Sequence, residues 1–219
     1  MDPVFETLRI EDGRARLVDR HLARLTRSGV DLARVAQTEA IIASACGRPD
    51  HILRLDLGGD HIIERPRPIR PSTPVDLVAV VAYDPHGRAR ERKTQDRSWA
   101  DVIEAGLADV SDGADREALL VDPSGRVGET TRANVFVIVG DAVVTPSAEG
   151  ILAGVTRSWV IEQTGAHERP VNLAELRRAD AVFLSTAGRG IVAVRTVDSH
   201  PVPVHPLVAE LARRWLALR

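Results

Sequence analysis

The order of apolar patterns in this 219-residue chain predicts an α+β fold. Strand-like and helical segments are mixed in both halves of the chain, and they do not follow strict β–α–β alternation. A doubly wound parallel sheet would need that alternation, so it is the less favoured class. With 44% hydrophobic residues, a chain of this length can bury roughly 70–75% of its unfolded surface, enough for one large domain or two small ones.

The first half opens with a predicted hairpin, because FETLRI and RARLV are separated by the turn-forming EDG. VDRHLARLTRSG spaces Leu22 and Leu25 at helical period and ends at Gly29, and DLARVAQTEAIIASACGR is predicted to form a second amphipathic helix. HILRLDL alternates at period two, and Gly58 and Gly59 turn it back into HIIER. RPRPIRPSTP is too rich in proline for a central strand, whereas VDLVAVVAY suits a strand covered on both faces.

The second half is predicted to begin after DPHGRARERKTQDR, a polar and irregular stretch. SWADVIEAGLADV is predicted to be helical, and EALLVD, VGETTRANVFVIV and AVVTP are predicted to be consecutive strands. GVTRSWVIEQTG is predicted to be a helix entered from a glycine. AVFLST and GIVAVRTVD are then predicted strands, and HPLVAELARRWLAL is a closing helix. We therefore predict a small α+β domain at 1–86, a linker at 87–97 that carries Lys93, and a larger domain at 98–219.

Composition excludes several classes of protein. The net charge of −2 shows that 31 acidic residues offset the basic ones, so nucleic acid is not an expected partner. No apolar run approaches the ~20 residues of a membrane span, and MDPVFETLRI lacks an apolar signal segment. Cys46 is the only cysteine, which excludes an intramolecular disulfide and favours a cytoplasmic location. We found no GxSxG, HExxH, paired-cysteine or GxxxxGK[ST] motif, so neither a metal site nor a serine hydrolase is expected.

One lysine stands among 29 basic residues, and the other 28 are arginines. Arginine serves wherever only a positive charge is needed, but it cannot lose its proton and act as an amine nucleophile. Lys93 is therefore a candidate for covalent chemistry, although a single exposed lysine is the plainer alternative. Its pKa would have to fall several units, and neighbouring cations could lower it. Four arginines crowd it in sequence: Arg88, Arg90, Arg92 and Arg97.

Other residues would suit an anionic cofactor with a nitrogen-containing ring. Glu129, in RVGETTRANVF, could keep a ring nitrogen protonated, although a solvent-facing strand glutamate is the alternative. GVTRSWV could bind a phosphate at a helix start through the amides of Val155 and Thr156 and the Thr156 hydroxyl. Thr156 could equally be an ordinary helix N-cap. Arg24 could add a bidentate clamp or be a surface residue, and STAG at 185–188 could border the phosphate.

The order of these motifs resembles the class IV aminotransferase family, the fold-type IV pyridoxal-phosphate enzymes. The resemblance follows FETLR, HLARL, the lone K-T, ETTRANVF, the TP–GILAGVTR pair and DAVFLSTA, and it covers residues 4 to 198 approximately. It implies two mixed α/β domains with the active site between them, pyridoxal 5'-phosphate as cofactor, a small-molecule substrate and a homodimer.

The resemblance also implies residue roles. Lys93 would attach the cofactor covalently and move a proton on and off the substrate, and Glu129 would pair with the ring nitrogen. Leu152 would pack on the ring. The phosphate would be held by Arg24, Val155 and Thr156, with help from Thr186 or its neighbours.

Departures from the family pattern concern the substrate side. Aminotransferases of this family carry a tyrosine five residues after the lysine, where this chain has Ser98, and the sole tyrosine is Tyr83. KTQDR resembles the K-T-x-N-R of aminodeoxychorismate lyases, with Asp96 in place of asparagine. LGG at 57–59 replaces the usual T-R-G turn, the segment that normally precedes FET is missing, and STAG drops or shifts one threonine relative to S-G-T-A.

The favoured function is an aminodeoxychorismate lyase, which releases pyruvate and 4-aminobenzoate for folate synthesis. A transaminase for D- or branched-chain amino acids is the alternative, and a non-catalytic cofactor-binding protein is a third hypothesis. Substrate carboxylates could be received by Arg132, Arg189 or an arginine near Arg65.

Overall fold

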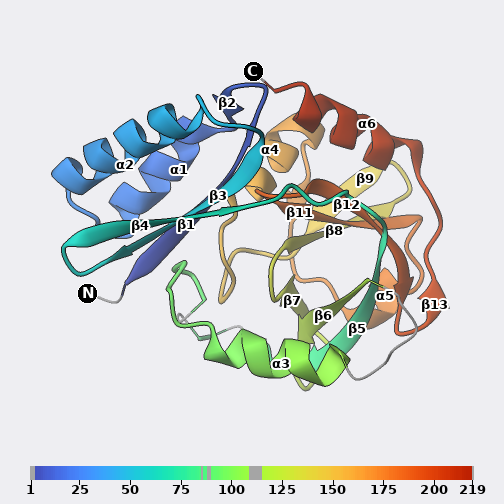
Figure 1. Ribbon diagram of the computed structural model, residues 1–219. Helices are drawn as coiled ribbons and strands as arrows, with labels where there is room; N and C mark the ends of the chain where they lie inside the picture. The colour runs from blue at the N-terminus through green and yellow to red at the C-terminus, as the bar shows by residue number, and fades with distance from the viewer. Residues whose placement is uncertain (1–2, 85, 88–89, 109–114, 219) are drawn as a thin grey trace.

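The computed structural model describes residues 3–84, 86–87, 90–108 and 115–218. In these residues, two sheets and the helices packed on them form an α+β structure (Figure 1). The fold class expected from the sequence is confirmed. In the described part of the chain, no helix is long and apolar enough to cross a membrane.

The first sheet has the order β2-β1-β3-β4, and all its pairs are antiparallel. Its strands are β1 (Val4–Glu11), β2 (Arg14–Ala15), β3 (His51–Gly58) and β4 (His61–Arg67). Proline is tolerated in β4 because this strand lies at the sheet edge. The predicted partner strand RARLV shortens to β2, because helix α1 already begins at Val18.

Helices α1 (Val18–Arg27) and α2 (Leu32–Ala45) cover one face of this sheet. Leu8, Ile10 and Leu53 pack there against Leu25 and Ile42 of the helices. Side chains alternate along each strand, so the neighbouring positions of β1 and β3 face away from the helices. That second face of the sheet borders the site described below.

The larger sheet runs β10-β9-β8-β11-β12-β5-β6-β7, with β13 paired to β12. Its strands are β5 (Val75–Val81), β6 (Arg116–Val121), β7 (Val127–Thr130), β8 (Asn134–Val139), β9 (Ala142–Thr145), β10 (His167–Glu168), β11 (Ala181–Thr186), β12 (Gly190–Val197) and β13 (His200–Pro201). β5 lies between β12 and β6 and is parallel to both.

This pairing differs from the predicted organisation in one respect. The predicted boundary at residue 86 assigns β5 to the N-terminal domain, yet β5 is a central strand of the larger sheet. A parallel central strand pairs with strands that are distant in the sequence, so a local sequence pattern cannot identify its partners. β5 is therefore a strand of the larger sheet, and the division of the chain into two domains stays a prediction.

Buried side chains pack on both faces of the larger sheet. Along β8, Val135 and Val137 belong to one apolar cluster, whereas Phe136 and Ile138 belong to another. The second cluster is completed by α4 (Val155–Thr164) and α6 (Pro206–Leu216), and the latter contributes Trp215. Helix α3 (Ser98–Ala108) packs near β6, and the short α5 (Leu173–Leu176) contributes Leu176 to the first cluster.

The sequence did not predict β10, β13 or α5, which are four residues or shorter. The predicted strand 127–139 is broken at 131–133, where Thr130 N donates to Ala133 O at 2.8 Å and the Thr130 hydroxyl accepts from Ala133 N. This turn separates β7 from β8, so Glu129 and Asn134 lie on either side of it.

Candidate active site

Lys93 lies where the segment between the two sheets runs against the start of β1. The Lys93 carbonyl accepts a hydrogen bond of 2.9 Å from Phe5 N, and Gln95 N donates one of 2.8 Å to Pro3 O. Gln95 Nε2 adds a bond of 3.0 Å to Val4 O. Lys93 Nζ lies 4.7 Å from the centre of the Phe5 ring. The segment that carries the lysine is thus held against the start of β1 by main-chain hydrogen bonds and by one from the Gln95 side chain.

The surroundings of the Lys93 amine favour its neutral form. Burial, assisted by the Arg24 guanidinium and opposed by the Glu6 carboxylate, lowers the pKa of Lys93 from 10.5 to about 7. Arg97 also lowers this pKa, as the sequence suggested for the nearby arginines, whereas Arg88 lies outside the described residues. A large share of the amine is therefore unprotonated at neutral pH, as a nucleophile or proton acceptor requires.

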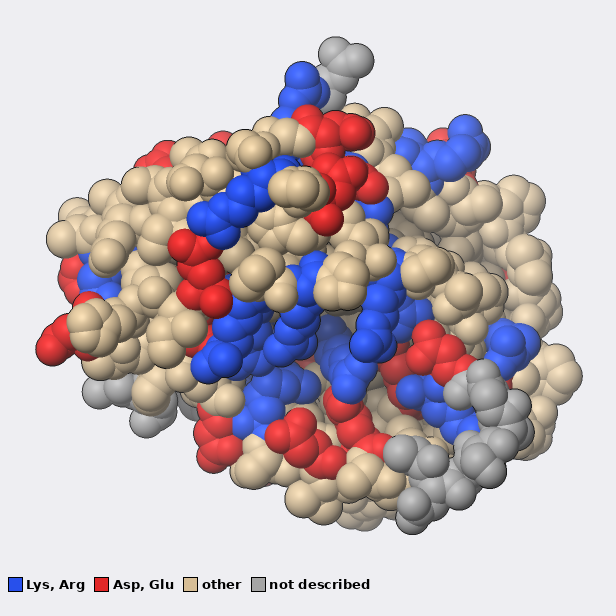
Figure 2. All heavy atoms as spheres, viewed as in Figure 1, with Lys and Arg blue, Asp and Glu red and all other residues tan. Residues whose placement is uncertain are grey.

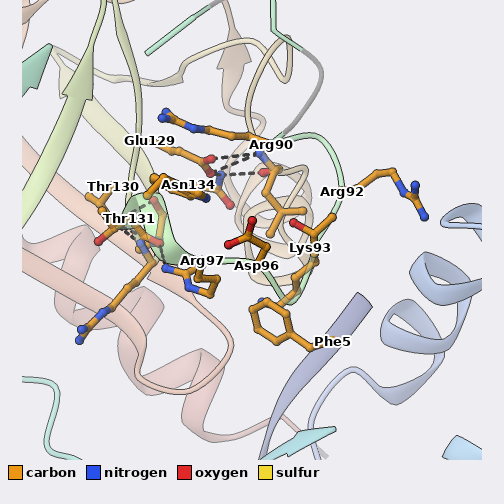
Figure 3. Close-up of a pocket in the computed structure, with 15 residues that line it drawn as sticks. Phe5, Arg90, Arg92, Lys93, Asp96, Arg97, Glu129, Thr130, Thr131 and Asn134 are labelled. Carbon is orange, nitrogen blue, oxygen red and sulfur yellow. Dashed lines mark hydrogen bonds between the residues drawn. The ribbon is translucent and has the colours of Figure 1, made fainter. Parts of the chain in front are cut away.

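Glu129 on β7 is a second titratable group of the same pocket and is only 7% exposed (Figure 3). Both its carboxylate oxygens lie 3.3 Å from Leu152 N, and Asn134 Nδ2 donates to Oε2 at 3.3 Å. Burial raises the pKa of Glu129 to about 8, although the Leu152 amide and the Arg90 charge oppose the rise. Glu129 can therefore hold a proton at neutral pH, and a cationic ring nitrogen beside it would favour the ionised pair.

Asn134, at the start of β8, connects Glu129 to the loop that leads into α4. Its Nδ2 also donates to Leu152 O at 2.8 Å. A Cβ atom built on Gly154 would lie 2.1 Å from Asn134 Oδ1, so this close approach requires glycine. The φ of Gly154 is −65°, so the reason is space and not backbone conformation.

Two buried hydroxyl groups without partners lie at the start of α4 and the end of β11. Thr156 Oγ1 and Ser185 Oγ accept or donate no hydrogen bond among the described residues, and both side chains line a cavity. Val155 and Thr156 begin α4, and the first amides of a helix have no acceptor within it. These amides, the helix dipole and the two hydroxyls form a site suited to an anion. Thr186 lines the same cavity.

Arg24 reaches this cavity from α1. Its Nε and Nη2 donate to the two carboxylate oxygens of Glu6 at 2.8 and 2.5 Å, and His21 Nδ1 lies 2.7 Å from Glu6 Oε2. The exposed fractions of Glu6, His21 and Arg24 are 1%, 2% and 7%. Burial alone would raise the pKa of Glu6, but the Arg24 charge and His21 outweigh it and lower that pKa below its ordinary value.

The cavity has a volume of about 760 Å³ and is lined from both sheets. A smaller pocket of about 70 Å³ contains Lys93 and Glu129, and it shares Leu152 and Asn134 with the larger cavity. Figure 2 shows basic side chains gathered around a hollow in the middle of this face. The cationic residues that line the larger cavity are Arg24, Arg54, Arg67, Arg70, Lys93, Arg97, Arg132 and Arg189, against the acidic Asp101 and Glu104. The cavity therefore favours an occupant with several negative charges.

Every site residue predicted from the sequence lines one or both of these spaces: Arg24, Lys93, Glu129, Leu152, Val155, Thr156 and Thr186. They come from α1, from β7 and β11 of the larger sheet, from the start of α4 and from the segments that precede α3 and α4. Their individual roles stay predictions.

Four contributors were missed: Glu6, His21, Asn134 and Ser185. Glu6, His21 and Asn134 belong to the quoted motifs FETLR, HLARL and ETTRANVF, so their motif positions were a usable signal. Ser185 was covered only as a neighbour of Thr186. A buried hydroxyl cannot be distinguished from an exposed one by sequence alone.

Tyr83, the sole tyrosine, does not line either space. Its hydroxyl donates to Glu149 O at 2.8 Å, and its ring packs on Gly128. Ser98 also lies outside both linings, at the start of α3, where Asp96 accepts from Ser98 N at 3.1 Å. Neither residue supplies a phenol to the site.

Residues 61–197 match the family model described as amino-transferase class IV. A probable branched-chain-amino-acid aminotransferase of Thermotoga maritima is 32% identical over 122 residues, which cover 47% of this chain and 45% of that protein. The chain thus aligns with less than half the length of this curated relative.

Solved structures share the fold over nearly the whole chain. A 4-amino-4-deoxychorismate lyase from Pseudomonas aeruginosa superposes with a TM-score of 0.78 at 27% identity, covering 97% of this chain and 89% of that one. The PLP-bound form of a hypothetical aminotransferase from Mycobacterium tuberculosis superposes with a TM-score of 0.84 at 23% identity, covering 99% and 88% of the two chains.

Proposed function

Because this chain belongs to the class IV aminotransferase family, we propose that it is a pyridoxal 5'-phosphate enzyme of the aminodeoxychorismate lyase type. It would convert 4-amino-4-deoxychorismate to pyruvate and 4-aminobenzoate, a precursor for folate synthesis. The observation that carries the proposal is that Lys93 and Glu129 line one pocket with pKa values shifted in opposite directions. Opposed shifts in one pocket are typical of an acid–base site.

The residues present fit this cofactor. Thr156 Oγ1 and Ser185 Oγ are buried and have no hydrogen-bond partner in the part of the chain that the structure describes, as expected of groups that await the oxygens of a phosphate. Arg24 and the first amides of α4 line the same cavity and supply positive charge. Lys93 would form the covalent bond to the cofactor, whose ring withdraws electrons from the bound substrate.

The residues of the chain would divide the remaining work. Glu129 would hold a proton at the ring nitrogen. After substrate displaces it, the Lys93 amine would accept and return protons, which its pKa near neutrality favours. Leu152 lines both spaces and would exclude water on one side of the ring.

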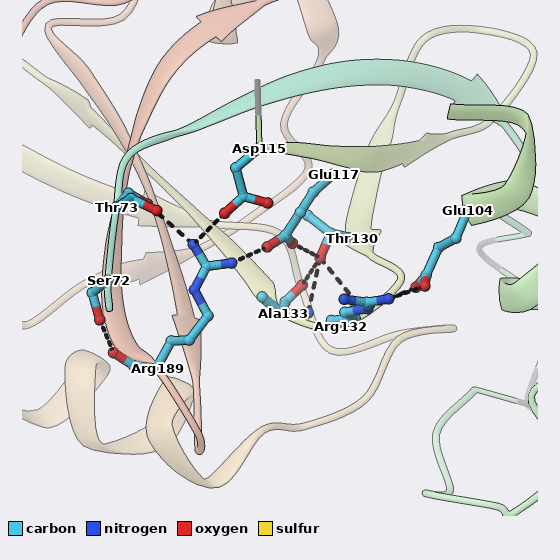
Figure 4. Close-up of polar contacts among 9 residues, drawn as sticks. All are labelled: Ser72, Thr73, Glu104, Asp115, Glu117, Thr130, Arg132, Ala133 and Arg189. Atoms are coloured by element: carbon cyan, nitrogen blue, oxygen red, sulfur yellow. Dashed lines mark hydrogen bonds and ion pairs between the residues drawn. The ribbon is translucent and has the colours of Figure 1, made fainter. Parts of the chain in front are cut away.

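Two arginines considered for substrate carboxylates are already engaged (Figure 4). Arg132 pairs with Glu104, and Arg189 Nη1 donates to Glu117 Oε1 at 2.8 Å. Arg65, the third position considered, is bonded to Asp56 at 2.5 Å and does not line the cavity.

Arg67 and Arg70 follow Arg65 closely and do line the cavity. Among the described residues, neither guanidinium has a hydrogen-bond or ion-pair partner. Both are exposed, so keeping them uncompensated costs little in the absence of substrate. We therefore assign the substrate carboxylates to these two arginines.

A transaminase is the second candidate, since the curated relatives that match are branched-chain aminotransferases. Two observations favour the lyase. Neither Ser98 nor Tyr83 supplies a tyrosine hydroxyl to the site, and the cationic cavity suits a dicarboxylate better than an aliphatic side chain. A cofactor-binding protein without turnover is the third candidate.

Borohydride reduction of the protein purified with pyridoxal 5'-phosphate, followed by peptide mapping, tests the cofactor assignment. A reduced adduct at residue 93 is expected, and its absence would contradict the proposal. Supplying 4-amino-4-deoxychorismate then tests the reaction. Pyruvate release supports the lyase, amino transfer to a keto acid supports the transaminase, and an adduct with neither activity supports the non-catalytic alternative.

We also propose a homodimer in the cytoplasm. The family resemblance supports the dimer, and the exposed Val102 on α3, with 74% of its surface accessible, offers apolar area for an interface. The single cysteine is compatible with a reducing compartment. Sedimentation of the purified protein tests the dimer, and a monomer across micromolar concentrations would contradict it.

A further inference from the structure

We infer that Glu6 and His21 are positioning residues for the phosphate of the cofactor. They hold Arg24 so that one edge of its guanidinium remains available to the anion. The inference rests on the proposed function, because it takes pyridoxal 5'-phosphate as the occupant of the cavity. Neither Glu6 nor His21 lines the cavity, so both would act through Arg24.

The alternation of side chains along β1 places its cavity-lining residues and Glu6 on opposite sides of the strand. Phe5 and Thr7 lie on the cavity side of the strand. Glu6 points to the opposite side, where Leu8 and Ile10 pack against the helices. A carboxylate among apolar side chains would be costly without partners, so its position there requires the cationic partner and hydrogen bonds that α1 provides.

The guanidinium of Arg24 has two usable edges, and Glu6 occupies one of them. Nε and Nη2 donate to Glu6 Oε1 and Oε2 at 2.8 and 2.5 Å. Nη1 has no acceptor among the described residues. A bidentate bond fixes the plane of a guanidinium, so the direction of the Nη1 edge is set before any anion arrives.

His21 completes the arrangement from one turn earlier in α1. Positions three apart in a helix lie on the same face, so His21 and Arg24 both reach Glu6. Burial lowers the pKa of His21 although Glu6 opposes this, so the ring is neutral at neutral pH. Because Glu6 is ionised, Nδ1 carries the hydrogen and donates to Oε2 at 2.7 Å. This bond prevents the carboxylate from rotating away from Arg24.

The test compares two ligands that differ only in the phosphate, pyridoxal 5'-phosphate and pyridoxal. Their dissociation constants for the apoprotein are measured by absorbance. The dissociation constant of pyridoxal divided by that of pyridoxal 5'-phosphate is the ratio that gives the contribution of the phosphate. The ratio cancels any change in the reactivity of Lys93, which both ligands share. In Glu6→Gln, Arg24 loses the charge of its partner, and we expect the ratio to fall roughly tenfold.

Glu11→Gln is the matched control. Glu11 also lies on β1 and bonds two arginines, Arg9 at 2.6 Å and Arg16 at 2.5 Å, but it lines neither cavity. The ratio of the two dissociation constants for Glu11→Gln should equal that of the wild type. A folded Glu6→Gln variant with an unchanged ratio, or with equal losses for both ligands, would overturn the inference.

A second pair of variants decides the question if Glu6→Gln does not fold. His21→Leu removes the donor and should lower the ratio, whereas His21→Asn retains a donor near the Nδ1 position and should restore it. Equal ratios for these two variants would overturn the inference. Failure of the wild-type protein to prefer the phosphorylated ligand would instead contradict the phosphate site of the proposed function.

Discussion

Lys93 permits a direct measurement of the environment of the candidate site. It is the only lysine of the chain, so an amine-selective reagent reports on this side chain once the peptide that contains it is isolated. A change of pKa from 10.5 to about 7 corresponds to about 5 kcal/mol of preference for the neutral amine. At pH 7, about half of the Lys93 amines are neutral, compared with roughly 0.03% for an ordinary lysine.

The assay follows the modification rate of residue 93 in the apoprotein by mass spectrometry between pH 5.5 and 10.5. We expect a midpoint near pH 7 in the folded protein and near ~10.4 in urea, which is the matched control for the same side chain. A folded midpoint above pH 9 would show that water or an acidic partner surrounds the amine. That result would refute burial as the cause and remove the basis for its role at neutral pH.

Three further predictions concern other parts of the site. The folded pKa of Glu129 is raised from 4.5 to about 8, so the folded apoprotein binds an extra proton between these values and its stability from this group falls as pH rises through them. Between pH 5 and pH 8, the free energy of unfolding from denaturant titrations should therefore decrease less for Glu129→Gln than for the wild type. Equal decreases would contradict the raised pKa. Replacing Arg67 and Arg70 by alanine should raise the KM for the dicarboxylate substrate roughly tenfold or more while cofactor binding stays unchanged, whereas Arg65→Ala, outside the cavity, should not change KM. Gly154→Ala would place Cβ 2.1 Å from Asn134 Oδ1 and should lower both the melting temperature and cofactor affinity; wild-type values would show that the loop relaxes freely.

Much of the fold could be predicted because its elements carry strong local patterns. The period-two run at 51–57 became β3, and the apolar run at 181–186 became β11 with the predicted bounds. The helix predicted at 18–29 ends two residues earlier, at Arg27. Local patterns failed where pairing is long-range. β5 is placed by β12 and β6, which lie more than 30 residues further along the chain.

The same distinction between local patterns and long-range contacts applies to the residues of the candidate site. The rarity of lysine singled out Lys93, and the order of the motifs singled out Glu129 and Thr156, because the types of residue that this chemistry needs are few. The sequence could not show that Arg132 and Arg189 are engaged by acidic partners, since Glu117 lies 72 residues before Arg189. Nor could it show that Arg67 and Arg70 line the cavity without an ion-pair partner in the described part of the chain.

The amino-acid sequence by itself determined the α+β class, the family and the chemical groups available to the site, because composition, periodicity and motif order are local properties of the chain. Only the tertiary structure decided the ionisation of those groups and their partners. A pKa depends on burial and on charges within a few ångströms. The pKa of Lys93 is lowered by burial and by the charges of Arg24 and Arg97, and these residues surround the amine only in the folded protein.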